Sequence, residues 1–208
     1  MNVLEKIHGG YVHNRRVQVL ARELSALLPA HGRVLDVGCG DGLLAAVIQA
    51  HTPGTTITGI DVLVRSETHI PVSQFDGSII PFADGSFDAV MFVDVLHHTD
   101  DPAVLLREAA RVARHVIVIK DHTLEGFAAQ VTLRLMDRIG NQRHNVALPH
   151  NYWPKRKWLE AFSTIGLMVR TWKSKLNLYP LPAEWIFGRS LHFVAQVAVE
   201  ENRPDAQP

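Results

Sequence analysis

The sequence predicts an α/β protein with a mostly parallel sheet that carries helices on both faces. Short runs of β-branched and apolar residues alternate with longer segments of helical periodicity down most of the chain, and crossover helices of this kind join parallel strands. The run 87–93 is also almost wholly apolar, as expected of a strand that is buried on both faces. The 208 residues suffice for one domain with a hydrophobic core.

The composition restricts the class of protein further. Lys and Arg together number 21, as do Asp and Glu, so the chain lacks the basic excess that nucleic-acid binders show. The single cysteine, Cys39, excludes an internal disulfide and a multi-cysteine zinc site. No apolar run approaches the roughly 18 residues of a membrane span, and the first residues lack the apolar core of a signal peptide. We therefore expect a cytoplasmic protein.

The elements of the first half are periodic runs with defined ends. Apolar residues recur at helical spacing in the first helix, which Pro29 and Gly32 end. The following β-forming run leads into closely spaced glycines, and Pro53 with Gly54 ends the next helix. The elements expected here are helix 12–28, strand 33–37, helix 43–50, strand 55–60, a short strand 72–75 and strand 87–93.

The second half continues the alternation. Pro102 suits the first turn of a helix, where its missing N–H has no partner to lose, and Gly140 and Gly166 each follow a helical run. Residues 1–200 are expected to form one domain, and the polar residues 201–208 a flexible tail. The elements expected here are helix 102–113, strand 115–119, helix 123–139, helix 155–165, strand 167–172 and strand 192–199.

A glycine-rich turn, DVGCGDG, occupies residues 36–42 between the first strand and its helix. Glycines at every second position let the backbone approach a ligand closely, since no Cβ intrudes. The helix N-terminus that follows offers free amides and the positive end of a dipole. A dinucleotide fingerprint would need a third glycine where Leu43 stands.

Three further segments accompany this turn: Asp61 after the second strand, the run 76–88 with its PFADGSFD sequence, and DVLHH at 94–98. In this order the motifs resemble the class I S-adenosylmethionine-dependent methyltransferases, in particular the small-molecule, type 11-like branch. The resemblance covers about residues 30–120, with weaker similarity at 158–167. It implies a Rossmann-like sheet of seven strands with an antiparallel final strand, and S-adenosyl-L-methionine as the cofactor.

The resemblance also implies roles for individual residues. Asp61 would accept hydrogen bonds from the two ribose hydroxyls, although an isolated Asp after a strand is more often a helix cap. Asp76 would bind the adenine amino group, and the thiol of Cys39 would be a packing group rather than a reactive one. The cofactor-binding residues expected are Asp36, Gly38, Cys39, Gly40, Asp61, Val62, Asp76, Gly77 and Asp94.

The sequence departs from the family pattern between Asp61 and Asp76. Only fourteen residues lie between them, whereas the family fits a full helix and a strand into this space. We therefore expect the third helix to be shortened or missing.

The acceptor side is predicted from the segments after the fifth strand. Transfer to an O–H or N–H nucleophile needs aligned reactants and a group that takes the proton. His122, oriented by Asp121, is the first candidate for this base, and His150 is a second one on a cap-like insertion over 123–153. The alternative is that residues 120–122 merely end a strand and bond nearby amides.

Two other features are open to a functional or a structural interpretation. The chain has 12 histidines, but neighbouring side chains at 97–101 should diverge at a strand exit, so no metal site is expected. Apolar positions at helical spacing and a basic excess over 134–157 suggest an anionic or partly hydrophobic substrate, or peripheral membrane contact. The alternative is that this apolar stripe packs on the sheet. The apolar positions are Leu124, Phe127, Ala128, Val131, Leu135 and Ile139.

The function predicted is methyl transfer from S-adenosyl-L-methionine to a small-molecule acceptor. Two alternatives stay open: a non-catalytic, methyltransferase-like partner subunit and, less in keeping with the glycine spacing, a nicotinamide-dependent oxidoreductase. Nucleic-acid methylation is disfavoured because DVLH, at 94–97, stands where an Asn/Asp-Pro-Pro-Tyr motif would be expected.

Overall fold

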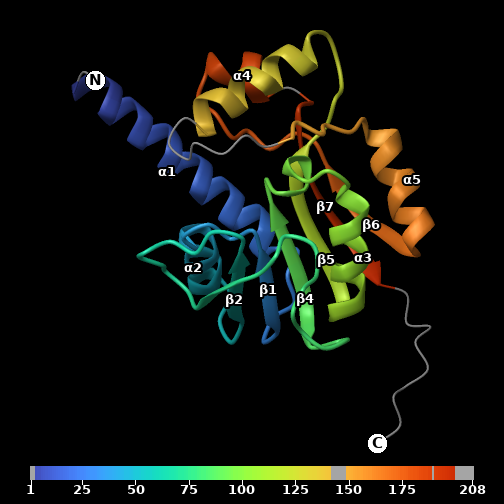
Figure 1. Cartoon of the computed structure of the whole chain (residues 1–208). Coiled ribbons are helices and arrows are strands. Elements are labelled where there is room, and N and C mark those ends of the chain that lie inside the picture. The colour runs from blue at the N-terminus through green and yellow to red at the C-terminus, as the bar shows by residue number, and fades with distance from the viewer. Residues whose placement is uncertain (1–2, 142–148, 189, 200–208) are drawn as a thin grey trace, which may run out of the picture.

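The computed structural model describes residues 3–141, 149–188 and 190–199. Its sheet has seven strands in the order β3-β2-β1-β4-β5-β7-β6 (Figure 1). The strands are β1 (Arg33–Val37), β2 (Thr56–Asp61), β3 (Val72–Gln74), β4 (Phe87–Val93), β5 (Ala113–His122), β6 (Leu167–Lys173) and β7 (His192–Val199). The helices are α1 (Val3–Ser25), α2 (Leu43–His51), α3 (Pro102–Val112), α4 (Ala129–Asn141) and α5 (Lys155–Ile165), with short turns η1 (Leu96–His98) and η2 (Glu184–Gly188).

Strand pairing confirms the predicted topology. Strands β3, β2, β1, β4 and β5 pair in parallel, and β7 pairs antiparallel with both β5 and β6. The carboxyl ends of the parallel strands therefore meet at one edge of the sheet, where ligands bind in open α/β folds. We call this edge the carboxyl edge.

Two hydrophobic cores lie on opposite faces of the sheet, as predicted. One joins Leu20 and Leu24 of α1 and Ile48 of α2 to the inner strands. The other joins Leu105 of α3 and Trp158 of α5 to the opposite face. Strands β1, β2, β4 and β5 are thus covered on both sides, which explains the continuous apolar runs seen in the sequence, whereas the edge strand β3 is mostly exposed.

Some predicted boundaries are wrong. Helix α1 begins at Val3 rather than residue 12. Strand β5 runs from Ala113 to His122, beyond the predicted 115–119, because β4 and β7 supply hydrogen-bonding partners along it. The helix expected from residue 123 begins only at Ala129, after left-handed backbone at Gly126 and Ala128.

The segment 62–71, which the structure describes throughout, contains no helix. The third helix is therefore missing rather than shortened. The segment is nevertheless anchored, because Ile70 is buried in the core beside α1 and α2 and the backbone N–H of His69 donates to the carbonyl of Asp41 at 2.8 Å.

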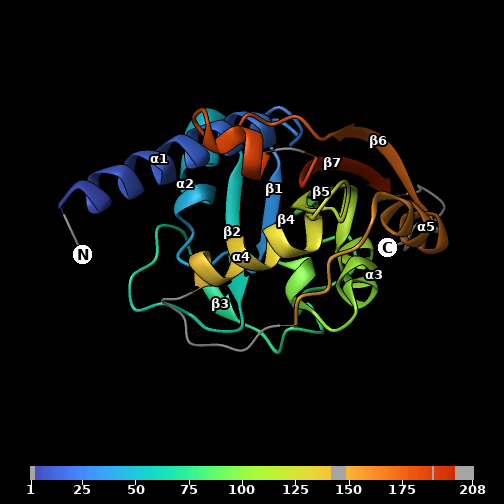
Figure 2. The ribbon, with the colours of Figure 1, turned by 90° about the horizontal axis from the view of Figure 1, so that it is seen from above.

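Helix α4 lies above the carboxyl edge in both views of the ribbon (Figures 1 and 2). Its inner face buries Ala129 and Leu133 against Tyr152 and Leu191. Residues 142–148 of the predicted cap and the predicted tail 201–208 lie outside the described residues, so the domain boundaries stay a prediction. No described helix is both long and apolar enough to cross a membrane.

Candidate cofactor and acceptor site

The glycine turn between β1 and α2 has the conformation that the sequence predicts. Gly38, Gly40 and Gly42 all have positive φ, between 61° and 75°. The amide of Gly38 donates to the carbonyl of Ile60 at 2.7 Å. A Cβ on Gly38 would lie 2.5 Å from a methyl carbon of Val95, so only glycine fits there without a shift. The turn is therefore held tightly against β2 and the exit of β4.

Asp61 is bonded to this turn. One carboxylate oxygen accepts from the amide of Gly40 at 2.8 Å, and the other accepts from the amide of Leu63 at 2.9 Å. These bonds fix the carboxylate between the glycine turn and the segment 62–71. Asp61 thus bonds neighbouring amides, but it caps no helix, because the segment 62–71 contains none.

Asp36 and Cys39 belong to the same turn. Burial and the neighbouring Asp61 carboxylate raise the pKa of Asp36 to about 8. Burial also raises the pKa of the Cys39 thiol to about 12, and this side chain packs so closely on Gly59 that a Cβ there would clash. The close packing and the raised pKa both favour a packing role for Cys39, because the thiolate is the reactive form.

The predicted adenine-side residues are more exposed. Asp76 uses one carboxylate oxygen to accept from the amides of Ser78 and Ile79, at 2.7 and 2.8 Å, and these bonds lower its pKa. The Val62 side chain is 53% exposed, and a Cβ on Gly77 would lie 3.1 Å from it. Val62 and Gly77 therefore line the same side of the site, while Asp76 stabilises its own turn.

Asp94 belongs to a partly buried ion-pair cluster at the end of β4. Its two carboxylate oxygens bond the Arg16 guanidinium from α1 and the Lys120 ammonium from β5. Burial would raise the pKa of Asp94, but Lys120 and Arg16 hold it well below its usual range. The fully buried Lys120 also lies 3.3 Å from Nδ1 of His192. Asp94 therefore ties α1 to the sheet.

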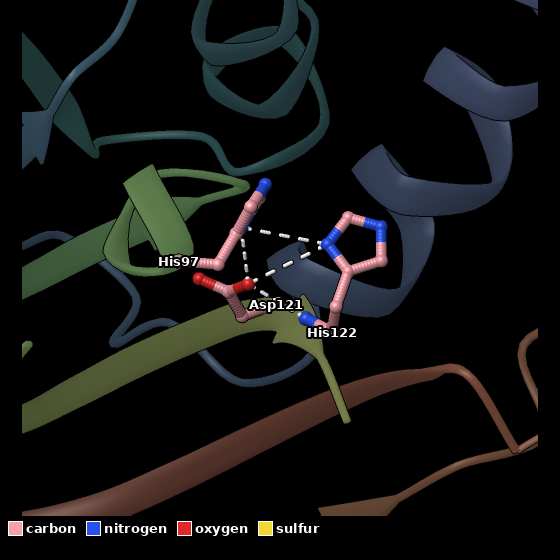
Figure 3. Close-up of side chains that lie close together, drawn as sticks. All are labelled: His97, Asp121 and His122. Atoms are coloured by element: carbon pink, nitrogen blue, oxygen red, sulfur yellow. Dashed lines mark hydrogen bonds and ion pairs between the residues drawn. The ribbon is translucent and has the colours of Figure 1, made fainter. Parts of the chain in front are cut away.

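Next to this cluster, His97, Asp121 and His122 come together (Figure 3), and we call them the HDH triad. Nδ1 of His97 lies 2.6 Å from Oδ1 of Asp121, and Nδ1 of His122 lies 3.4 Å from Nδ1 of His97 and 3.5 Å from the same Asp121 oxygen. The side chains of His97 and Asp121 are fully buried, and that of His122 is 7% exposed. Asp121 therefore makes its short side-chain bond to His97, not to the predicted partner His122.

The backbone fixes the HDH triad. Asp121 accepts from the amide of Leu96 at 3.0 Å and from that of His122 at 2.6 Å. Burial would raise the pKa of Asp121, but His97 and His122 lower it below its ordinary value. Burial and the nearby Lys120 lower the pKa of His122. Asp121 is thus a carboxylate and His122 a neutral imidazole near neutral pH.

His150 lies at the rim of this site. It is exposed, and its Nδ1 is 3.5 Å from the hydroxyl of Tyr152. The Tyr152 ring stacks on His97 with centroids 5.5 Å apart. His150 is therefore separated from the HDH triad by one aromatic ring.

Four residues of the site were not among the predicted catalytic or cofactor-binding residues: Arg16, His97, Lys120 and His192. Arg16 lies 78 residues from Asp94, and His192 lies 72 residues from Lys120, so no local motif joins either pair. Two signals were available: His97 stands in the DVLHH run at 94–98, and Lys120 is a charged residue at the end of an apolar strand run, directly before Asp121.

Known proteins resemble this chain in sequence and in fold. Residues 11–171 match the methyltransferase domain family. A ubiquinone biosynthesis O-methyltransferase of Paracidovorax citrulli is 35% identical over 105 residues, 44% of this chain and 43% of that protein. A 27-O-demethylrifamycin SV methyltransferase of Amycolatopsis mediterranei is 29% identical over 131 residues, 53% of this chain and 48% of that protein. The matches thus span less than half the length of these two relatives.

The solved structures confirm the fold. A SAM-dependent methyltransferase from Aquifex aeolicus superimposes with a TM-score of 0.60 at 17% identity, over 86% of this chain and 88% of that one. The family match extends over most of the chain and includes the glycine turn, Asp61 and the HDH triad. The chain therefore belongs to the methyltransferase domain family, with the fold of class I S-adenosylmethionine-dependent methyltransferases.

Proposed function

We propose that this protein transfers a methyl group from S-adenosyl-L-methionine to an oxygen atom of a small-molecule acceptor. The main support is the adjacency of two sites on the carboxyl edge. One is the glycine turn with Asp61, and the other is the buried cluster of ionisable side chains around Asp94 and the HDH triad. The relatives named as methyltransferases of ubiquinone biosynthesis and of a rifamycin favour a small acceptor.

The cofactor side fits the ligand chemically. Gly38 and Gly40 carry no Cβ that would keep a ligand off the backbone, and the Asp61 carboxylate is fixed beside them for two ribose hydroxyls. Val62 would cover one face of the adenine, and Gly77 lies beside it. Asp36, Cys39 and Asp76 shape the turns around the ligand. The backbone at Asp94 would face the methionine end. When bound, the cofactor supplies an electrophilic methyl group.

The acceptor side provides proton acceptors. His122 is neutral near pH 7, so its imidazole is able to take a proton from an acceptor hydroxyl, and Asp121 is placed to stabilise the imidazolium that forms. His150 at the rim would contact the acceptor as it enters under α4. Exposed Phe127 just before α4 and exposed Val131 on α4, together with the basic residues of 134–157, suit an anionic or partly hydrophobic acceptor. We retain the cytoplasmic location as a prediction.

Calorimetric titration tests the cofactor assignment. S-adenosylhomocysteine and S-adenosylmethionine should bind with micromolar affinity, and Asp61→Ala should abolish binding. Asp76→Ala is the matched control, since its carboxylate is exposed and bonds only its own turn, and it should weaken binding less. Failure of the intact protein to bind either ligand would favour the partner-subunit alternative, and tight binding of NADH would favour the oxidoreductase.

The proton acceptor is tested by turnover with labelled cofactor and a panel of phenols and hydroxy acids. His122→Gln should lower kcat by about 10²–10⁴-fold and leave S-adenosylhomocysteine affinity unchanged. His150→Gln should act mainly on KM. Unchanged turnover in His122→Gln would contradict the assignment of the base.

A further inference from the structure

The geometry of the HDH triad points to a binding site for a first-row divalent metal cation, with Zn²⁺ as its best probe. We propose that Nδ1 of His97, Oδ1 of Asp121 and Nδ1 of His122 are its protein ligands. These atoms lie within 4.8 Å of one another, and all three residues are buried. No metal site was expected from the neighbouring residues 97–101 alone, whereas the fold brings His97 against Asp121 and His122 of β5.

The separations fit metal–ligand distances. The three edges are 2.6, 3.4 and 3.5 Å, so a point equidistant from the three atoms lies about 1.9 Å from each, against about 2.0–2.2 Å for Zn–N and Zn–O bonds. A cation slightly out of this plane would reach the full bond length. The shortest edge would have to lengthen by several tenths of an ångström, because the cation replaces the proton shared by His97 and Asp121. That proton would move to the other ring nitrogen of His97.

The chemistry of the donor set favours the same class of ion. Two imidazoles and one carboxylate suit Zn²⁺, Fe²⁺ or Co²⁺ rather than Mg²⁺ or Ca²⁺, which prefer oxygen ligands. The ligands are also held in place. The amide of Leu96 bonds Asp121, the amide of Asn151 bonds the carbonyl of His97 at 2.9 Å, and the indole of Trp158 bonds the carbonyl of His122 at 3.2 Å. Such outer bonds preserve the orientation of metal ligands.

Neighbouring charges set the affinity. Asp94 lies 3.6 Å from Nδ1 of His122 and adds a second carboxylate. Arg16 and Lys120 both bond this carboxylate, which offsets only part of their positive charge. A dication at the HDH triad would therefore bind with micromolar affinity, more weakly than in structural zinc sites that have several thiolates and no adjacent cations.

The metal site would serve the acceptor side of the reaction, and this use rests on the proposed function. Three protein ligands leave at least one coordination position open, as in catalytic zinc sites. An acceptor hydroxyl bound there would lose its proton to solvent more readily, because the cation stabilises the oxyanion. In that state His122 would hold the cation, and the cation would replace it as the group that activates the acceptor.

Metal binding is tested on the full chain after treatment with a chelator and dialysis. Calorimetry with ZnCl₂ should show one equivalent bound in the micromolar range. Co²⁺ should give the intensified visible absorption of a four- or five-coordinate ion. His97→Gln and His122→Gln should each weaken Zn²⁺ binding by at least about tenfold and abolish the Co²⁺ spectrum. The control His115→Gln removes an exposed imidazole at the far end of β5 and should change neither.

Two outcomes would overturn the proposal. One is the absence of a micromolar Zn²⁺ site in the intact protein, and the other is a weak, six-coordinate Co²⁺ spectrum. Both are read on the unsubstituted chain, so they hold even where a variant fails to fold. S-adenosylhomocysteine titrations with and without chelator separate the two proposals, because the glycine turn and Asp61 contain no residue of the HDH triad.

Discussion

Gly38 and Gly40 are two glycines of one turn that are under different structural constraints. Both have the left-handed backbone that favours glycine, but only Gly38 is also confined by a neighbour, the side chain of Val95. The sequence motif predicted the turn because these needs are local. It did not distinguish the two glycines, since Val95 lies more than fifty residues further along the chain.

Alanine at these two positions should therefore have unequal effects on stability. Gly40→Ala should lower the free energy of unfolding by about 1–2 kcal/mol, the cost of a left-handed alanine. Gly38→Ala should lower it further, because its methyl group also clashes with Val95. Urea denaturation measures both, and equal losses would show that the contact with Val95 relaxes without cost.

The buried Asp36 should make stability depend on pH. Its pKa in the folded protein is about 8, against an ordinary value of about 3.9 in the unfolded chain. The folded state therefore holds a proton that the unfolded chain has lost. Below about pH 4 this has no effect, and between about pH 4 and pH 8 it lowers stability progressively as the pH rises.

Asp36→Asn, which cannot ionise, should lack this dependence. Urea midpoints measured between about pH 5 and pH 9 should show that the stability of the variant increases relative to that of the wild type as the pH rises. Parallel pH profiles for the two proteins would mean that Asp36 titrates at its ordinary value in the folded state.

At the scale of elements, boundaries were harder to predict than types. The run 3–11 contains Gly9 and Gly10, and glycine has a low helix propensity. Helix α1 nevertheless includes both, which shows that intrinsic propensity alone does not decide where a helix begins. Helix α4 begins six residues later than predicted, after the left-handed backbone at Gly126 and Ala128, and β5 continues three residues further than predicted, to His122 along β7. Pairing with a strand seventy residues away decides where β5 ends, and no local pattern reveals it.

Helix α4 offers a matched pair of substitutions. Leu133 is fully buried against Tyr152 and Leu191, whereas Val131 on the outer face is 71% exposed. Leu133→Ala should destabilise the α4 region by about 2–4 kcal/mol, and Val131→Ala should have little effect. Hydrogen exchange of the α4 amides reports both. Equal exchange rates in the two variants would contradict the packing of α4 over the carboxyl edge.

At the scale of the whole molecule, the sequence predicts the fold class and the mostly parallel sheet well, because these depend on periodicity and on residues close together in the chain. The cluster of Arg16, Asp94, Lys120 and His192 was not predictable in the same way. It assembles from α1, β4, β5 and β7, and only the folded sheet brings those segments together.

Ligand binding should stabilise the whole domain. At one hundred times its Kd, S-adenosylhomocysteine should add about 2.7 kcal/mol to the free energy of unfolding, which raises Tm by roughly 5–10 °C for a chain of this size. Differential scanning calorimetry should show this shift for the wild type and none for Asp61→Ala. NADH at the same concentration should leave Tm unchanged, and an equal shift with NADH would argue against a methyltransferase cofactor site.

Because of the antiparallel strand β7, the last strands cannot join the sheet in the order in which they are synthesised. Strand β6 is synthesised before β7. Within the described residues β6 pairs only with β7, which lies between β6 and β5. During translation β6 therefore has no partner strand, and the edge of β5 stays unpaired, until residues 192–199 have been synthesised. A nascent chain arrested before His192 should contain the first five strands and leave β6 unpaired, a state in which chaperones would find an exposed strand.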